Sequence, residues 1–340
     1  MSPLSQRRLE RIVDAFSRVK LLVVGDVMLD EYLWGDVERV SQEAPVPVVH
    51  VRRESIALGG AGNVVRNVVG LGGRCACAAT VGEDSAGRLI GDLLKDHGVE
   101  ASGIVRVPGR PTTRKTRVEA RSQQIVRFDR ETTGPLPRAA ARRLLASVEA
   151  TLPSMDGVIL EDYGKGVLER SIARGVISRC RAVAVPVYVD PKEELRAFRG
   201  ATLIKPNLRE AEALTGIVAR SPDGLARAIQ RLRRATGGAD VVVTRGAAGM
   251  TVAEGDAELR DVPTAAPEVF DIQGCGDTSI AALALARCCG ASLLEAAVIA
   301  NAAAGVVARK VGTAIATPAE VCAALGSVVA AVRAGPRSAS

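Results

Sequence analysis

The 340-residue sequence has few aromatic residues, two histidines and no long hydrophobic run. Because Phe, Trp and Tyr make up 2% of the chain, stacking on bases is not a main feature, and we expect no nucleic-acid partner. His50 and His97 are too few to favour a zinc site. No apolar run approaches the roughly 20 residues that span a bilayer, and no signal sequence opens the chain. We therefore expect a soluble, cytoplasmic protein without a membrane partner.

Paired cysteines are missing as well. The seven cysteines are odd in number and show no C-x-x-C spacing, which fits a reducing cytoplasm better than a disulfide framework. The 45 Lys and Arg residues exceed the 38 Asp and Glu residues, and the resulting charge of +7 is spread along the chain. This charge favours anionic partners, and phosphorylated small molecules fit it well.

Short aliphatic runs alternate with helical patterns, which predicts an α/β fold with a mostly parallel central sheet flanked by helices. We expect core strands at residues 21–24, 75–81, 157–160, 187–189, 202–204 and 240–243. We expect helices at residues 62–69, 85–97, 138–150, 169–179, 222–235, 278–289, 293–307 and 318–332.

Two segments break this alternation and look like β-structure outside the main sheet. They include residues 46–51 and 112–130, and together they predict a small β lid over a cleft, with lid segments near 38–58 and 110–130. No linker divides the chain, so we expect one domain over residues 1–335 and a disordered tail at 336–340.

The most informative segment is Asp271-Ile272-Gln273-Gly274-Cys275-Gly276-Asp277, which leads into an apolar helix. Glycines at a helix start let backbone N–H groups turn toward an anion, where the helix dipole favours negative charge. A carboxylate at the same place would repel a phosphate, so Asp277 needs a reason to be there. From the residues alone, it is either a helix cap or a catalytic base.

This segment resembles the second signature of the ribokinase-like (PfkB) carbohydrate kinases, Asp-Thr-x-Gly-Ala-Gly-Asp before a helix. Asp271, Gly274, Gly276 and Asp277 match, whereas Ile272 and Cys275 replace the usual Thr and Ala. The resemblance implies that Asp277 is the general base on the acceptor hydroxyl. It also implies that the backbone of Gly274, Cys275 and Gly276 forms an anion hole for the transferred phosphoryl group.

Other segments match the family in the same order along the chain. Gly59, Gly60 and Asn63 match its first signature, where Asn63 is expected both to cap a helix and to bind sugar hydroxyls. By resemblance, Asp30 accepts a hydrogen bond from a sugar hydroxyl at the cleft floor. These four residues are therefore expected to bind the substrate.

The resemblance also assigns the nucleotide and the metal. Asn207 and Glu210 match an Asn-x-x-Glu element that helps to hold Mg²⁺, through water, although Glu210 also suits the first turn of a helix. ATP and Mg²⁺ are the implied cofactors. The residues expected to bind ATP are Lys205, Asn207, Thr244, Arg245, Gly246, Gly249 and Asn301.

Five longer runs, at residues 39–48, 114–117, 123–129, 162–166 and 190–192, carry a more specific resemblance. Within the family, they are most similar to the heptose 7-phosphate kinases of lipopolysaccharide precursor synthesis. A substrate that already carries a phosphate needs cations in its pocket. The residues expected to contribute to that pocket are Arg114, Lys115, Arg117, Gln124, Arg127, Asp162, Lys165 and Lys192. Some of these charges would equally suit a solvated lid face.

The resemblance implies transfer of the ATP γ-phosphate to the anomeric hydroxyl of D-glycero-β-D-manno-heptose 7-phosphate. Some relatives fuse this kinase to a nucleotidyltransferase with a His-x-Gly-His motif, which this sequence lacks, so we expect a separate adenylyltransferase. The alternatives are a phosphofructokinase-like kinase and a non-catalytic nucleotide-binding regulator. A dinucleotide oxidoreductase is disfavoured because no Gly-x-Gly-x-x-Gly follows the first strand. We also expect a homodimer formed through the lid.

Overall fold

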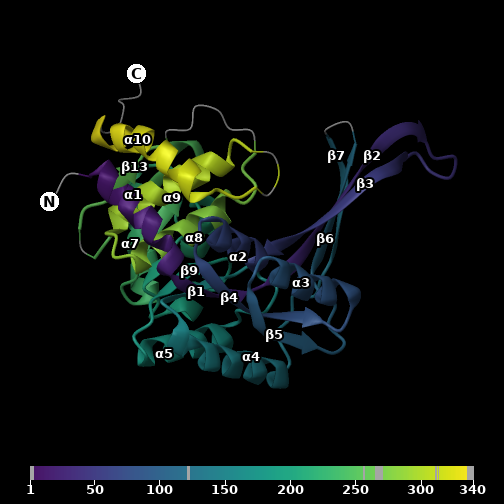
Figure 1. Ribbon diagram of the computed structural model, residues 1–340, viewed down its shortest axis with the longest axis horizontal. Coiled ribbons are helices and arrows are strands. Elements are labelled where there is room, and N and C mark those ends of the chain that lie inside the picture. The colour runs from purple at the N-terminus through teal and green to yellow at the C-terminus, as the bar shows by residue number, and fades with distance from the viewer. Residues whose placement is uncertain are drawn as a thin grey trace.

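The computed structural model describes residues 4–120, 123–255, 257–264, 271–310, 312 and 314–334. These residues form a large sheet between two layers of helices, and a second sheet projects from one side (Figure 1). The large sheet runs β13 (Arg260–Val262), β12 (Met250–Ala253), β11 (Asp240–Thr244), β10 (Leu203–Ile204), β9 (Val187–Asp190), β8 (Gly157–Glu161), β1 (Lys20–Gly25), β4 (Arg74–Gly82) and β5 (Glu100–Val107). The strands from β5 to β11 are parallel, whereas β12 runs antiparallel to both of its neighbours, β11 and β13.

The central strands form because their runs of apolar residues are buried on both faces, as a parallel sheet between helices requires. Leu21 and Val23 of β1 face one core, while Leu22 and Val24 face the other. The first face is covered by α1 (Gln6–Asp14), α2 (Ala61–Gly70), α3 (Ser85–Asp96), α8 (Cys275–Cys288), α9 (Leu293–Val307) and α10 (Pro318–Ala334). The second is covered by α4 (Arg138–Thr151), α5 (Arg170–Ala182), α6 (Leu208–Thr215) and α7 (Pro222–Thr236).

The α/β prediction is confirmed, and each expected core strand and helix is present with small shifts at its ends. The sequence analysis missed α1, α6, β5 and the edge strands β12 and β13. The edge strands are only four and three residues long, too short for a periodicity to be visible. The predicted tail, residues 336–340, lies outside the described residues. Within the described ranges, no helix is long and apolar enough to cross a membrane.

The projecting sheet is the predicted lid. Its strand order is β3 (Pro47–Gly60), β2 (Val27–Val40), β6 (Arg114–Ala120) and β7 (Gln123–Arg130), with β2 and β6 parallel and the other pairs antiparallel. The predicted lid boundaries were wrong at the start, because β2 already begins at Val27. Its first residues are all buried at the root of the lid and therefore lack a strand-like alternation.

One consequence concerns Asp30, which the sequence placed at the cleft floor. It lies on the buried root of the lid strand β2, where residues alternate between two faces of the sheet. Asp30, Tyr32 and Trp34 share one face, whereas Glu31 and Leu33 share the other. Strand β6 pairs with β2 only as far as Gly35, so the outer parts of β2 and β3 continue as a two-stranded ribbon (Figure 1).

Candidate active site

The predicted anion hole lies at the start of α8. Gly274 precedes the helix with a φ of 78°, a left-handed conformation that favours glycine. The N–H of Cys275 donates to the carbonyl of Ile272 at 3.3 Å, so this predicted member of the anion hole is already engaged. The N–H groups of Gly276 and Asp277 have no acceptor within the described part of the chain. Such first-turn N–H groups, at the positive end of the helix dipole, suit an anion.

Asp277 lies in the first turn of α8 and is 7% exposed. Its side chain does not cap the helix, which removes the structural alternative raised by the sequence. Asn63 Nδ2 donates to Asp277 Oδ2 at 2.5 Å, and the Tyr163 hydroxyl donates to Oδ1 at 2.9 Å. Burial raises the pKa of Asp277, while these two hydrogen bonds and the charge of Lys205 act to lower it. The carboxylate is thus held in one orientation by two donors.

Asn63 belongs to α2, but it does not cap that helix as predicted. The helix begins at Ala61 and its N-cap is Gly60, which has no side chain to cap it, while the Asn63 side chain is turned toward Asp277. A second contact joins the same two helices, since the Thr278 hydroxyl donates to Asn67 Oδ1 at 2.6 Å. Helices α2 and α8 therefore position the two ends of the Asn63–Asp277 contact together.

Gly59 and Gly60 lie at the base of the lid, where each leaves room for a group from β2 or from the residue before it. A Cβ on Gly59 would stand 2.2 Å from Asp30 Oδ2, so only glycine leaves room for the Asp30 carboxylate. Gly60 has a φ of 56°, and a Cβ there would stand 2.3 Å from the carbonyl oxygen of Asp26. The structure thus brings Gly59 and Asp30 together at the root of the lid, where the charge of Asp30 also acts on Asp277.

A group of buried charges lies below the anion hole. Lys205, which is 2% exposed, contacts Asp190 Oδ2 through its Nζ at 2.7 Å. A Cβ on Gly276 would stand 3.9 Å from the same Nζ, which places Lys205 beneath the predicted phosphate loop. Burial raises the pKa of Asp190 to about 7 even though Lys205 opposes that shift. The pKa of Lys205 is itself raised, because Asp190 and Glu161 outweigh the effect of burial.

The sequence analysis missed two residues of this region, Glu161 and Tyr163. Glu161 ends the buried strand β8, and burial together with Asp190 and Asp277 raises its pKa well above the usual value. Tyr163 follows two residues later and reaches Asp277. The signal was their position, because polar groups at the carboxyl end of a central parallel strand commonly line a ligand cleft.

The two residues predicted to help hold the metal ion are hydrogen-bonded to each other. Asn207 and Glu210 form a capping box at the start of α6, with Asn207 Oδ1 accepting from the Glu210 N–H and Glu210 Oε2 accepting from the Asn207 N–H. Lys192 contacts Glu210 Oε1 at 3.2 Å. The described residues contain no cluster of three metal-ligating side chains. The arrangement therefore fits a Mg²⁺ ion held through water and phosphate oxygens, and it does not fit direct ligation by this pair.

Four of the residues predicted to bind the nucleotide lie at the end of β11 or directly after it: Thr244, Arg245, Gly246 and Gly249. Thr244 pairs with Asn207 through an isolated bridge, and Arg245 contacts Asp261 at 3.2 Å. Glycine is required at Gly249, since a Cβ there would stand 2.0 Å from the Val262 carbonyl oxygen. Gly246 has a φ of 58° but open space around it.

Asn301, the next predicted nucleotide residue, lies on α9. Its Nδ2 donates to the Pro263 carbonyl at 2.9 Å, and it lines a cavity of about 210 Å³ between α9 and α10. Gly305 and Arg309 line the same cavity. The structure therefore brings Asn301 to the side of the molecule where the nucleotide residues gather.

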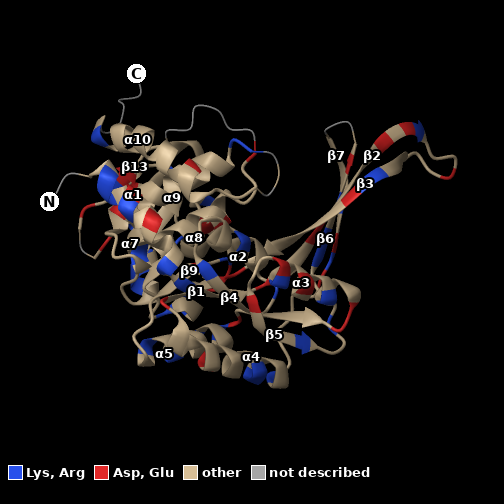
Figure 2. Cartoon of the chain, viewed as in Figure 1, with Lys and Arg blue, Asp and Glu red and all other residues tan. Residues whose placement is uncertain are grey.

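The predicted phosphate-binding cations are paired with carboxylates. Figure 2 shows Lys and Arg next to Asp and Glu along the lid strands. The contacts are Arg117 with Asp30 at 2.7 Å, Arg114 with Glu31 at 2.9 Å, Lys115 with Asp129 at 2.8 Å, Arg127 with Asp129 at 3.0 Å and Lys165 with Glu131 at 2.8 Å. These cations would have to exchange partners to bind a phosphate.

The two faces of the lid separate these cations. Lys115 pairs in register with Asp30, and Arg117 with Tyr32, so both lie on the Asp30 face. Arg114 lies on the opposite face, where it lines a cavity of about 260 Å³ with Phe128 and Ile56. The structure does not bring Arg114 to the face that carries Asp30. Gln124 is exposed on β7.

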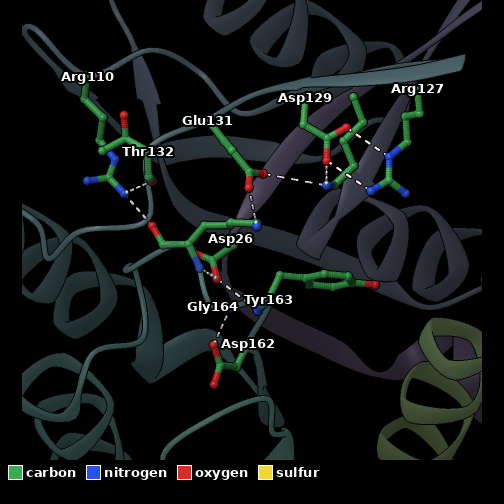
Figure 3. A network of polar contacts seen from close by, with 11 residues as sticks. Asp26, Arg110, Arg127, Asp129, Glu131, Thr132, Asp162, Tyr163 and Gly164 are labelled. Atoms are coloured by element: carbon green, nitrogen blue, oxygen red, sulfur yellow. Dashed lines mark hydrogen bonds and ion pairs between the residues drawn. The ribbon is translucent and has the colours of Figure 1, made fainter.

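The segment after β8 connects the lid to the sheet (Figure 3). Asp162, predicted to bind sugar hydroxyls, accepts from the backbone N–H groups of Gly164 and Lys192 at 2.9 and 3.1 Å. Asp26 accepts from the N–H groups of Tyr163, Lys165 and Val167. Both carboxylates therefore fix backbone, and the side chain of Lys165 extends to Glu131 beyond the end of β7.

Comparison with known proteins identifies a matching family and similar proteins. The pfkB family carbohydrate kinase profile matches residues 18–320. The bifunctional protein HldE of Rhodospirillum rubrum is 45% identical over 93% of this chain, and that of Caulobacter vibrioides is 46% identical over 92%. The chain spans only 64% and 65% of the length of these two relatives.

Solved structures show the same fold at low identity. Phosphofructokinase-2 from Escherichia coli, in a tetrameric inhibited form, has a TM-score of 0.74 and 20% identity, with 93% of this chain and 99% of that one covered. Arabidopsis thaliana ribokinase, complexed with ribose and ATP, has a TM-score of 0.71 and 21% identity, with 90% and 98% covered. From the extent of the profile match and the identity to HldE, the chain belongs to the pfkB family of carbohydrate kinases, which transfer a phosphoryl group to a sugar hydroxyl.

Proposed function

We propose that this kinase transfers the γ-phosphoryl group of ATP to the anomeric hydroxyl of D-glycero-β-D-manno-heptose 7-phosphate, giving the 1,7-bisphosphate for lipopolysaccharide precursor synthesis. The observation that carries the proposal is Asp277, a buried carboxylate oriented by Asn63 and Tyr163 beside the free N–H groups at the start of α8. The heptose assignment is supported by the HldE relatives and by the cations on the Asp30 face of the lid.

In the proposed reaction, Asp277 takes the proton from the acceptor hydroxyl as the oxygen attacks the γ-phosphorus, and the bond from that phosphorus to the β,γ-bridging oxygen breaks, so that ADP leaves. The N–H groups of Gly276 and Asp277, and the charge of Lys205 beneath them, stabilise the negative charge on the transferred group. Thr244, Arg245, Gly246, Gly249 and Asn301 hold the nucleotide. Asn207 and Glu210 would help to hold a Mg²⁺ ion through water, and the ion would neutralise charge on the phosphates when bound.

The acceptor would lie between the lid and α8. Asp30 and Asn63 bind sugar hydroxyls, and Gly59 and Gly60 allow the backbone to come close to the ring. The phosphate already on the sugar displaces carboxylates from Arg117, Lys115, Arg127 or Lys165, which are held on the lid side of the cleft. The charged pairs thus keep the cations in place until a phosphate arrives.

A panel of acceptors tests this function. Heptose 7-phosphate, fructose 6-phosphate and ribose are compared by kcat/KM, with ADP release as the readout. We expect the heptose 7-phosphate to be preferred. Preference for fructose 6-phosphate would assign the chain to a phosphofructokinase-like activity, and ATP binding without turnover on any sugar would favour a regulator.

We further propose that the chain is one kinase domain over residues 1–335, that it works in the cytoplasm, and that it forms a homodimer through the lid. The seven cysteines are unpaired, in keeping with a reducing compartment. The lid exposes Val40, Val46 and Phe128, whose exposed fractions are 64%, 51% and 54%. A two-stranded ribbon is marginally stable alone, so a second lid is a natural cover. Light scattering that gives a monomer would contradict this pairing.

A further inference from the structure

We propose that Tyr163 is a positioning residue for phosphoryl transfer, whose hydroxyl holds the carboxylate of Asp277 in the orientation that receives the acceptor proton. The inference rests on the proposed role of Asp277 as the base. It adds a residue that belongs to neither glycine signature and that comes from a different part of the chain. Its support lies in three features of the described residues.

The first feature is the division of donors between the two oxygens of Asp277. Asn63, from α2, occupies Oδ2 at 2.5 Å, and Tyr163, from the segment after β8, occupies Oδ1 at 2.9 Å. With only one donor, the carboxylate would be free to rotate about its Cβ–Cγ bond. With one donor on each oxygen it is fixed, and each oxygen keeps a second lone pair for a substrate proton.

The second feature is the anchoring of Tyr163 itself. Its backbone N–H donates to Asp26 Oδ2 at 2.9 Å, and the same carboxylate accepts from the N–H groups of Lys165 and Val167 at 3.0 Å each. Arg110 adds hydrogen bonds to the carbonyls of Thr132 and Lys165. In Figure 3 the ring of Tyr163 points away from this anchor. The hydroxyl is therefore placed by backbone contacts that do not depend on Asp277.

The third feature is the electrostatic need for a donor. Burial raises the pKa of Asp277 and so disfavours the ionised form that a base must have. The hydrogen bonds from Asn63 and Tyr163 act in the opposite direction. Tyr163 remains a donor because burial and nearby carboxylates raise its own pKa well above the usual value. The other titratable groups that interact with Asp277 are Lys205, Asp30, Glu161, Asp190 and Cys275.

The test compares Tyr163→Phe with Tyr188→Phe. Tyr188 is also buried and its hydroxyl contacts Cys288 Sγ at 3.5 Å, so its variant controls for the loss of a buried hydroxyl. For Tyr163→Phe we expect kcat at pH 7 to fall about tenfold or more, as for loss of a hydrogen bond to a charged group. The KM for ATP should stay unchanged.

The pH profile separates positioning from a structural effect. Removing a contact that lowers the pKa of Asp277 lets that pKa rise, so the acidic limb of kcat should move to higher pH in Tyr163→Phe. The limb should not move in Tyr188→Phe. If Tyr163→Phe does not fold, 3-fluorotyrosine at position 163, a more acidic phenol, is expected to move the limb to lower pH.

Asp277→Asn provides the reference that keeps the two claims apart. If Asp277→Asn abolishes turnover and Tyr163→Phe shifts the limb, the inference is supported. If Asp277→Asn abolishes turnover but neither change at position 163 moves the acidic limb of kcat, the inference is overturned while the proposed function stands. If Asp277→Asn keeps full turnover, the role of Asp277 fails, and the role of Tyr163 fails with it.

Discussion

The end of the large sheet and the lid hold their charges in opposite ways. At the sheet end, Asp277 and Lys205 are buried and the Asp190 side chain is 13% exposed. Each has fixed partners from neighbouring elements, and burial is the largest influence on each pKa. On the lid, Lys115 and Arg127 share Asp129 on strands that remain partly open to water. The sheet end is thus built to hold one arrangement, and the lid to exchange partners.

This difference suggests a division of labour. Chemistry needs groups fixed to within fractions of an ångström, and buried hydrogen-bonded groups provide that. Recognition of a phosphorylated acceptor needs cations that can leave their carboxylates at low cost, and an exposed pair such as Arg127 with Asp129 contributes only about 0–1 kcal/mol. The Arg117–Asp30 pair is held more firmly, because its side chains are 12% and 8% exposed. Substitutions at the two regions should therefore have effects of different size and kind.

The largest effect is expected at the sheet end. Asp277→Asn keeps the shape of the side chain but removes the base, so turnover should fall by on the order of 10²–10⁴-fold. ATP binding should remain, since the residues proposed to hold the nucleotide, such as Thr244, Arg245 and Asn301, are positioned by other contacts. Steady-state kinetics and a nucleotide-binding titration measure the two quantities. Turnover equal to that of the unchanged protein would remove Asp277 from the mechanism.

The second effect concerns stability. Lys205→Met leaves Asp190 buried without its partner, and breaking a buried pair costs about 3–5 kcal/mol. Denaturant unfolding should show that loss. Lys192→Met is the matched control, because the Lys192 pair with Glu210 lies nearer the surface and its loss should cost about 1 kcal/mol or less. Equal losses in the two variants would contradict the contrast between fixed and exchangeable pairs.

The smallest effect is expected on the lid. Arg117→Ala should raise the KM for a phosphorylated acceptor by about 10–100-fold, as for loss of a hydrogen bond to a charged group, with little change in kcat. Arg114→Ala removes a similar charge from the opposite face and should leave that KM unchanged. If the two variants behave alike, the Asp30 face is not the one that binds the acceptor.

The fold could be predicted because its strands are nearly continuous apolar runs that fit no exposed environment. The site was predictable as far as it is local in sequence, as with Gly274 and Asp277. The partners of these residues were not, because the contacts of Asp277 with Asn63 and Tyr163 join segments 214 and 114 residues apart. The face on which Arg114 lies depends on the register of β6 with β2. The start of β2 could not be located from the sequence, because its first residues are all buried and show no alternation.

The pairing of Asn207 with Glu210 illustrates a different difficulty. Both residues fit a metal motif and a capping box equally well in sequence, and the structure adopts the capping box. Asp162 was likewise expected to bind a sugar, yet its carboxylate holds backbone N–H groups. Polar residues near a cleft thus divide between those that contact ligand and those that shape the loops, and composition cannot separate the two.

The most direct test is the position of the new phosphate. ³¹P NMR can follow heptose 7-phosphate with ATP and Mg²⁺ as the protein turns over. The account predicts a second sugar phosphate resonance, coupled to the anomeric proton, that grows in step with ADP and does not appear with Asp277→Asn. Phosphorylation at any other carbon, or no product from this heptose while fructose 6-phosphate is consumed, would contradict it.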